Sequence, residues 1–108
     1  MLGHVDATGR IVDMREDGEA WRLEIDIPDA IEPLVIPKGS IAVDGISLTI
    51  ARLDAASFDV QIVPHTLANT TLRAVRPGTP VNLECDVLGK YVNRAVSLAL
   101  ARPLVAHP

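Results

Sequence analysis

The chain has 108 residues, of which 48% are hydrophobic and 22% are charged, so it can build one folded domain with a single core and is not a disordered segment. Its formal net charge of -4 would repel a phosphate backbone, and aromatic residues make up only 3%, so no nucleic-acid partner is expected. The single cysteine, Cys85, cannot close an intrachain disulfide, which suits a reducing compartment, and we expect a cytoplasmic protein.

The first 27 residues predict two antiparallel strands. Residues 21–27 (WRLEIDI) alternate apolar and charged side chains, which is typical of a strand with one face in water. In residues 5–14 the apolar positions change parity, so we expect a β-bulge at Gly9 or its neighbours. The Asp-Gly pair within residues 16–19 tolerates the positive φ angles of a hairpin turn, so the two strands should pair.

Four more short strands follow. Residues 40–43, 47–53, 57–63 and 81–87 have strand patterns. The Asp-Gly turn at residues 44–45 lies between the first two of these strands, and a second hairpin is expected through residues 54–56. Asp29 is expected to cap a short helical turn that Pro33 ends. Residues 65–72 are polar and predict a loop or a single helical turn.

A terminal helix is predicted from Leu88 to Arg102, where apolar residues recur at spacings of three and four. The same region carries Lys90 and Arg94, so it does not fit a membrane span. Leu98 and Leu100 widen its apolar face, and we therefore expect the helix to pack against something besides its own domain.

Six antiparallel strands and one helix predict an all-β fold, a small six-stranded barrel with a C-terminal α-helix, because closure removes exposed strand edges. We expect one domain over residues 1–108, with the barrel over about 1–87 and the helix over 88–102.

The pattern contains no familiar catalytic template. The histidines lack metal-ligand spacing and the glycines are scattered, so no metal site or phosphate-binding loop is predicted. Small polar groups remain on three segments: His4 beside Gly3, Ser47 with Thr49, and Thr66. Strand ends and turns meet at the rim of a barrel, and a ligand pocket there is one interpretation.

A structural interpretation stands beside each of these. Ser47 and Thr49 also fit the exposed face of an ordinary strand. Asp44 also fits a turn former, Lys38 a solvated turn lysine, and Asp86 a helix N-cap.

Four motifs in order resemble the C-terminal lumazine-binding domain of riboflavin synthase. They are GHV at 3–5, KG at 38–39 leading into VDGISLT at 43–49, VPHTL at 63–67 with TTL at 70–72, and VNLECD at 81–86. The similarity covers nearly the whole chain. It implies a barrel of the Greek-key type, one of two tandem barrels in the enzyme, followed by a helix that helps to hold a trimer together.

The resemblance implies an enzyme that converts two molecules of 6,7-dimethyl-8-ribityllumazine to riboflavin and 5-amino-6-ribitylaminouracil, with no cofactor and no metal. It implies that Ser47 activates or supplies a nucleophilic oxygen, that His4 carries a proton, and that Asp44 and Asp86 orient them. Lys38 would contact the ribityl chain. The implied substrate-binding residues are Gly3, His4, Val5, Lys38, Ser47, Leu48, Thr49, Val63, Pro64, His65, Thr66, Leu67 and Ala68.

The chain departs from the other half of that enzyme, which typically begins Met-Phe-Thr-Gly and has a cysteine where this chain has Ser47. The resemblance therefore implies one half-site, whose partner is the missing N-terminal lumazine-binding domain. Alone, the chain is expected to bind lumazine or riboflavin with little or no turnover. A homo-oligomer is expected, a trimer for the full enzyme and a dimer or trimer for this domain.

Two other function classes stay open. A non-catalytic lumazine- or flavin-binding antenna module would keep the pocket and never react. An assembly role built on the apolar terminal helix would show no ligand at all.

Overall fold

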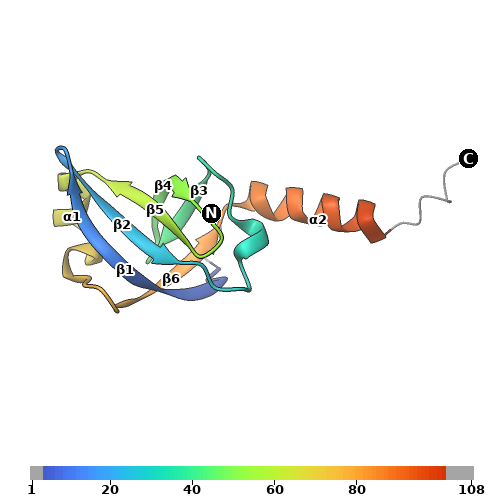
Figure 1. The fold of residues 1–108 in the computed structure, drawn as a ribbon, viewed down its shortest axis with the longest axis horizontal. Helices are drawn as coiled ribbons and strands as arrows, with labels where there is room; N and C mark the ends of the chain where they lie inside the picture. Colours follow the sequence, from blue (N-terminus) through green and yellow to red (C-terminus); the bar gives the residue numbers. More distant parts are fainter. Residues whose placement is uncertain (1–3, 102–108) are drawn as a thin grey trace, which may run out of the picture.

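A computed structural model describes residues 4–101 of the chain, apart from the side chains of residues 87–89, 92, 93 and 101. Six antiparallel strands close into a barrel in the order β1-β2-β5-β4-β3-β6 (Figure 1). The strands are β1 (Ala7–Asp17), β2 (Ala20–Asp26), β3 (Ser40–Val43), β4 (Ile46–Leu53), β5 (Ser57–Ile62) and β6 (Pro80–Cys85).

The strand order is that of a Greek key, because the consecutive hairpin strands β3, β4 and β5 are followed by β6, which returns to pair with β3. The two predicted hairpins are confirmed, and the turn at residues 44–45 joins β3 and β4 in a third. The parity change in β1 is also confirmed as a bulge, but the register shifts between Ile11 and Asp13 rather than at Gly9. Ile11 is buried in the core, whereas Val12 faces out and is 48% exposed.

The barrel is filled by aliphatic side chains and one aromatic ring, that of Phe58. β1 lies so close to its neighbours that a Cβ at Gly9 would come within 2.8 Å of Leu83 Cδ1 and 3.1 Å of the Asp26 carbonyl oxygen. The absence of a side chain at Gly9 therefore lets β1 approach the rest of the barrel. The core residues with at most 1% exposure are Leu23, Ile25, Ile31, Ile41, Val43, Ile50, Phe58, Val60, Ile62, Leu72, Val81, Leu83 and Cys85.

Short helical segments connect the strands: η1 (Glu32–Leu34), α1 (Pro64–Ala68) and η2 (Thr71–Ala74). The prediction for Asp29 is wrong. The N-cap of η1 is Ile31, and Pro33 lies inside the turn instead of ending it, since the first turn of a helix needs no amide donor from proline. The single helical turn predicted after residue 64 is present as α1.

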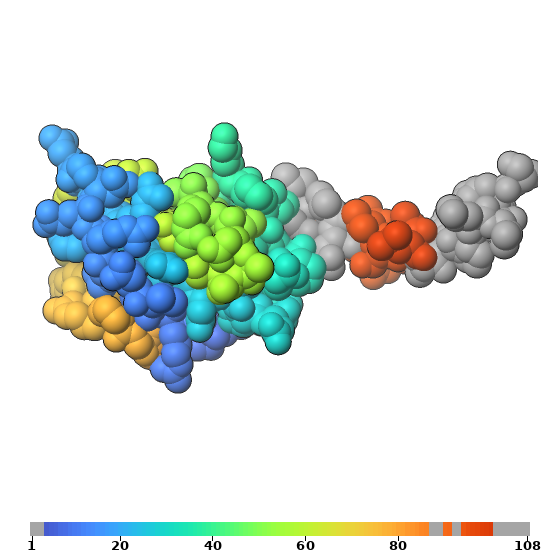
Figure 2. All heavy atoms as spheres, in the orientation of Figure 1, coloured from blue at the N-terminus to red at the C-terminus, as the bar shows by residue number. Residues whose placement is uncertain are grey.

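The terminal helix α2 (Val87–Ala101) extends away from the barrel (Figures 1 and 2) and begins one residue before the predicted start; the predicted end, Arg102, lies outside the described residues. It contacts the barrel domain near η1, and Lys90 Nζ lies 3.0 Å from Asp6 Oδ2. Tyr91, Val96 and Leu100 are 70%, 51% and 81% exposed. Across the described part of the chain, no helix has the length and apolar character needed to cross a membrane.

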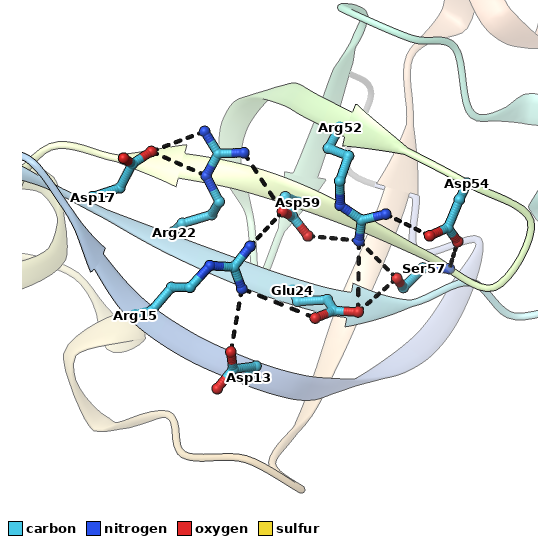
Figure 3. Close-up of polar contacts among 9 residues, drawn as sticks. All are labelled: Asp13, Arg15, Asp17, Arg22, Glu24, Arg52, Asp54, Ser57 and Asp59. Atoms are coloured by element: carbon cyan, nitrogen blue, oxygen red, sulfur yellow. Dashed lines mark hydrogen bonds and ion pairs between the residues drawn. The ribbon is translucent and has the colours of Figure 1, made fainter.

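An ion network covers the outer faces of β1, β2, β4 and β5, with Asp59 at its centre (Figure 3). The Asp59 side chain is fully buried although it faces outward, because the guanidinium groups of Arg15, Arg22 and Arg52 lie over it at 2.8, 3.6 and 2.8 Å. A buried carboxylate costs free energy unless it is paired, and here three cations pair it. The outer face of the barrel is therefore covered here by paired charges rather than by apolar side chains.

Candidate functional site

An open depression of about 460 Å³ lies on the barrel wall between β4, the end of β5 and α1. It has no charged side chain in its lining, although the chain as a whole is 22% charged. The lining residues are Ala20, Ser47, Leu48, Thr49, Ala51, Gln61, Ile62, Val63 and Thr66. A neutral lining with four polar side chains favours an uncharged ligand that has both apolar and hydrogen-bonding parts.

The depression exists because β4 changes partners along its length. Its first half pairs with β3, from Ser40↔Thr49 to Val43↔Ile46, and its second half pairs with β5, from Ile50↔Val60 to Leu53↔Phe58. The β4–β5 register shifts between Ile50 and Arg52, which places a bulge at Ala51. β5 keeps pairing with β2 as far as Trp21↔Ile62. A seam therefore opens between residues 47–49 and residues 61–63.

The backbone groups along this seam can be assigned by alternation. The Ile50 amide donates to the Gly39 carbonyl at 2.9 Å, so in the first half of β4 the even-numbered peptide groups face β3 and those of Ser47 and Thr49 face the seam. On β5, the Ser57 carbonyl accepts from the Asp54 amide at 3.0 Å, which places the odd-numbered groups, including those of Gln61, on the β4 side. Both banks of the seam thus present backbone donors and acceptors to a ligand.

Side chains on β4 alternate as predicted. Leu48 and Ile50 are 9% and 1% exposed and belong to the core, whereas Ser47 and Thr49 are exposed on the outer face. Both hydroxyls line the depression. The interpretation of this segment as one wall of a pocket therefore agrees with the geometry.

The opposite wall is the strand-to-helix junction at residues 63–66. Val63 is the N-cap of α1 with extended backbone angles, and Pro64 occupies the first turn, where a missing amide costs nothing. The Val63 carbonyl accepts from the Leu67 amide at 3.1 Å, and the Thr66 carbonyl accepts from the Thr70 hydroxyl at 2.8 Å. These bonds hold Val63 and Thr66 at the rim of the depression.

Other residues of the predicted site surround this junction without lining the depression. Pro64, His65 and Ala68 lie on α1, and Leu67 packs against the core. His65 is exposed, and its Nδ1 lies 3.3 Å from Asn69 Nδ2. These four residues lie close to Val63 and Thr66 in the sequence, and Val63 and Thr66 do line the depression.

Lys38 and Asp44 both have a positive φ, of 61° and 49°, in the turns that flank β3. Lys38 is exposed and precedes Gly39, whose carbonyl holds Ile50 of β4. The Asp44 carboxylate accepts from the Asn82 amide at 2.7 Å, and Asp44 lines a separate depression of about 420 Å³. That contact braces the β3–β4 turn against β6.

Of the predicted residues near the two ends of the barrel sequence, His4, Val5 and Asp86 do not line the depression. Gly3 is outside the described residues. His4 and Val5 are exposed before β1, and Val5 is 60% exposed. Asp86 stands between β6 and α2, where it lines a cavity of about 60 Å³ together with Leu34 and Ser40. The roles predicted for His4 and Asp86 stay predictions.

The depression brings together five of the predicted residues, which are Ser47, Leu48, Thr49, Val63 and Thr66. The sequence reasoning missed Ala20, Ala51, Gln61 and Ile62. Alternation along residues 57–63 could have placed Gln61 on the same face as Val63. Ala20 and Ala51 carry no such signal, because their positions depend on the hairpin tip and on the bulge.

Two further observations concern the chemistry of the described residues. Within residues 4–101, no group of three or more His, Cys, Asp and Glu side chains is placed to hold a metal ion. Burial raises the pKa of the Cys85 thiol to about 11, with a further contribution from nearby Asp6, so Cys85 is a poor nucleophile at neutral pH. Its amide donates to Asp6 Oδ2 at 2.7 Å, which ties the start of the chain to β6.

Residues 2–86 match the family described as the lumazine binding domain. The chain belongs to the lumazine-binding domain family. The matched range covers the whole barrel from before β1 to the end of β6, and the depression lies within it.

Curated relatives of this lumazine-binding domain are riboflavin synthases. The enzyme of Mycobacterium bovis is 48% identical over 101 residues, which cover 90% of this chain and 50% of the relative. That of Photobacterium phosphoreum is 41% identical over 92 residues, which cover 85% of this chain and 42% of the relative. The chain thus spans about half the length of the curated relatives it matches.

Similar solved structures are those of LumP. A crystal structure of LumP complexed with riboflavin has a TM-score of 0.69 and 28% sequence identity, covering 78% of this chain and 45% of that one. A crystal structure of LumP complexed with 6,7-dimethyl-8-(1'-D-ribityl) lumazine has a TM-score of 0.69 and 29% identity, covering 77% of this chain and 46% of that one. Most of this chain is therefore similar in fold to a protein that has been crystallised with these two ligands.

Proposed function

We propose that this chain is one lumazine-binding half of a riboflavin synthase, and that it binds 6,7-dimethyl-8-ribityllumazine and riboflavin in the depression between β4, β5 and α1. The observation that carries the proposal is the uncharged seam, where backbone edges and the hydroxyls of Ser47, Thr49 and Thr66 meet. The riboflavin synthases among the curated relatives support it, as do the ligands of the LumP complexes.

The ligand's chemistry matches such a seam. A lumazine has a flat pyrimidinedione edge with alternating donors and acceptors, which backbone groups near Val63 and Thr66 can bind. The ring would lie against the exposed apolar side chain of Val63, and the hydroxylated ribityl chain would meet Ser47 and Thr49. No positive charge is needed, since the ligand is neutral.

The proposed reaction moves a four-carbon unit between two lumazines, giving riboflavin and 5-amino-6-ribitylaminouracil. Loss of a proton from the 7-methyl group of one lumazine leaves a charge that the ring delocalises, so a weak base can assist. The partner lumazine is electrophilic, and Ser47 would activate or supply the oxygen that adds to it. The largest contribution to the rate would come from holding the two rings in opposed orientation. In well-oriented systems such positioning lowers the activation free energy by up to roughly 7 to 11 kcal/mol.

A single barrel provides one of the two ring-binding surfaces. The depression is open on its outer side, and its lining comes from one copy of β4, β5 and α1 with Ala20 of β2. The second surface would come from an N-terminal lumazine-binding domain, for which half of the relatives' length leaves room. Alone, the chain would bind its ligand with little or no turnover.

Further roles belong to the same proposal. His4 would carry a proton, Lys38 would reach the ribityl chain past the Ala51 end of the seam, and Asp44 and Asp86 would act as supports. The Asp44 carboxylate accepts a hydrogen bond from the Asn82 backbone amide, and this bond positions the turn that leads into Ser47. These roles are assigned by resemblance rather than by contact with the depression.

The proposal includes a homo-oligomer held by α2. The exposed side chains of Tyr91, Val96, Leu98 and Leu100 give this helix apolar surface that its own barrel leaves uncovered. Burial of such surface against other copies of the helix would stabilise an assembly, a trimer for the full enzyme and a dimer or trimer for this domain.

A second candidate is a non-catalytic lumazine or flavin carrier, which the likeness to LumP favours. Its pocket would be the same, and it would not react even beside a complete second half.

Fluorescence titration of the 108-residue protein with 6,7-dimethyl-8-ribityllumazine, followed by an assay for riboflavin, separates these functions. The half-site predicts saturable binding without rapid synthesis, and synthesis when an N-terminal riboflavin synthase domain is added. Binding that never leads to product under either condition favours the carrier. No binding leaves only the assembly role, and rapid synthesis by the chain alone would contradict the half-site.

A further inference from the structure

Asp6 is the residue at which the start of the described range joins the barrel. Its amide donates to the Leu83 carbonyl at 2.8 Å, and its carboxylate accepts from the Cys85 amide at 2.7 Å. His4 and Val5 are exposed, and neither has a hydrogen bond or an ion pair with another described residue. Within residues 4–101, Asp6 is therefore the first residue that is held to β6.

The same carboxylate oxygen also binds the terminal helix. Lys90 Nζ lies 3.0 Å from Asp6 Oδ2, the atom that accepts from the Cys85 amide. The side chains of Asp6 and Lys90 are 20% and 33% exposed, so water screens this pair less than it screens an ion pair on the open surface. Among the described side chains of α2, only that of Lys90 forms an ion pair with the barrel domain. One oxygen atom thus joins the approach to β1, the end of β6 and the start of α2.

The helix itself does not favour a lysine at position 90. Lys90 stands in the first turn of α2, where its amide donates to the Asp86 carbonyl at 3.3 Å. The dipole of a helix disfavours a cation in this turn, because the positive end of the dipole lies there. The contact with the Asp6 carboxylate offsets that cost and accounts for the position of Lys90.

We propose that Asp6 is a positioning residue for His4, and that the Lys90–Asp6 ion pair couples the direction in which residues 4–5 leave the barrel to the placement of α2. This assignment rests on the proposed function, in which His4 carries a proton and α2 holds an assembly. An assembly that fixes α2 would fix the segment that carries His4 as well. Neither Asp6 nor Lys90 lines the depression, so the pair acts on the reaction and leaves ligand affinity there unchanged.

The first test measures riboflavin synthesis by the 108-residue chain after an N-terminal riboflavin synthase domain is added. Lys90→Met removes the charge and keeps the apolar stem, and we expect kcat to fall about 10-fold with KM unchanged. Lys90→Arg keeps the charge and should restore most of the rate. Asp13→Asn is the matched control, because it removes an ion pair of 3.2 Å to Arg15 on the outer face of the barrel, and it should change neither value.

Asp6→Asn separates the ion pair from the hydrogen bond at the same residue. Its carboxamide oxygen can still accept from the Cys85 amide, but the charge that binds Lys90 is lost. The loss of kcat should match that of Lys90→Met. The double variant should lose no more than either single variant, because both substitutions remove one interaction.

A second readout needs no reaction. The heteronuclear ¹⁵N NOE of the Val5 amide should fall in Lys90→Met and Asp6→Asn and stay at the wild-type value in Lys90→Arg and Asp13→Asn. The Kd for 6,7-dimethyl-8-ribityllumazine should stay within about 2-fold of the wild-type value in all four variants. The mass of the particle by light scattering should not change.

Unchanged kcat in Lys90→Met overturns the assignment, whether or not the NOE falls. A Kd that rises in step with the loss of rate, or a changed mass, also overturns it, since the pair would then act on the ligand site or on assembly. If the wild-type chain forms no riboflavin with the added domain, the proposed function fails and the positioning role fails with it. That result differs from a loss of rate that is confined to the variants.

Discussion

The buried carboxylate of Asp59 on β5 lies 2.8 Å from the guanidinium of Arg52 on β4, across the strand pair that closes the barrel beyond the seam. Arg52 also bonds Asp54 and Ser57, so one side chain joins the β4–β5 turn to the sheet. β4 and β5 pair next to this contact, from Ile50↔Val60 to Leu53↔Phe58. Beyond it, between residues 47–49 and 61–63, the two strands do not pair, and the depression lies there.

Asp59→Asn should lower the free energy of unfolding by about 2 kcal/mol at pH 7, because it leaves three guanidinium groups without their shared carboxylate. Asp13→Asn is the control. Its carboxylate also meets Arg15 at 3.2 Å, but its side chain is 52% exposed, so the cost should be under about 0.5 kcal/mol. Urea unfolding of the two variants and the wild type measures both values.

The pH dependence of the same variant follows from the pKa of Asp59. Burial would raise this pKa, but the hydrogen bond and charge of Arg52, with those of Arg15, hold it below its ordinary value. A depressed pKa gives stability that is present above the unfolded value, about 3.9, and is lost as the pH falls below it. The difference between wild type and Asp59→Asn should therefore be constant from pH 7 to 5 and shrink towards pH 3. A difference of the same size at pH 3 would contradict the role of the ionised carboxylate.

Ser47→Ala and Thr49→Val should each weaken binding of 6,7-dimethyl-8-ribityllumazine by roughly 3- to 10-fold, the value of about one hydrogen bond. Both side chains are exposed, so the fold should be kept. Thr71→Val removes a hydroxyl from the separate depression beside Asp44 and should have no effect. Titration of the three variants decides between the two depressions. Unchanged affinity of Ser47→Ala and Thr49→Val, or a loss of affinity in Thr71→Val, would show that the ligand does not bind between β4, β5 and α1.

Gly9→Ala should lower the free energy of unfolding by about 1 to 3 kcal/mol. Its Cβ would lie 2.8 Å from Leu83 Cδ1 inside the core and 3.1 Å from the Asp26 backbone oxygen, so β1 or its neighbours must shift. Thr8→Ala on the same strand, with an exposed side chain, is the comparison and should cost little. Thermal melting of the pair measures the effect, and a wild-type melting temperature for Gly9→Ala would show that the contact is not tight.

Leu98→Glu combined with Leu100→Glu should reduce the mass of the particle in solution if α2 holds an oligomer. Leu98 and Leu100 are 45% and 81% exposed, so charges there should disturb assembly and leave the barrel folded. Light scattering of both proteins, with circular dichroism as the check on folding, provides the measurement. A monomeric wild type, or an oligomer whose mass the two substitutions do not change, would contradict the proposal that α2 holds the oligomer together.

Alternation of side chains along Ser47 to Ile50 was sufficient to predict which residues face the core, because a strand has a period of two. The first hairpin followed from the turn chemistry of its Asp-Gly pair. The seam could not be predicted, since it depends on a one-residue bulge at Ala51 that carries no compositional signal. Asp29 was misassigned because an aspartate that follows a proline fits both a helix cap and an ordinary turn.

The motif resemblance identified more residues of the depression than side-chain periodicity did, but not all of the residues that it implied line the depression. Ser47, Thr49, Val63 and Thr66 come from two distant segments and meet in one depression. Asp44 occurs in the same motif as Ser47 and Thr49, and His4 and Asp86 occur in two other motifs, yet none of the three lines this depression. Neighbours in a motif can lie on different faces and at different ends of a strand, so a shared motif does not place them in one pocket.

Amide chemical shifts of the ¹⁵N-labelled chain during titration with 6,7-dimethyl-8-ribityllumazine test the central claim most directly, because they report where the ligand binds. We expect the largest saturable changes at residues 47–49, 61–63 and 66, on the two sides of the seam. Changes centred on Asp44, Asn69 and Arg73, or the absence of any saturable change, would contradict it.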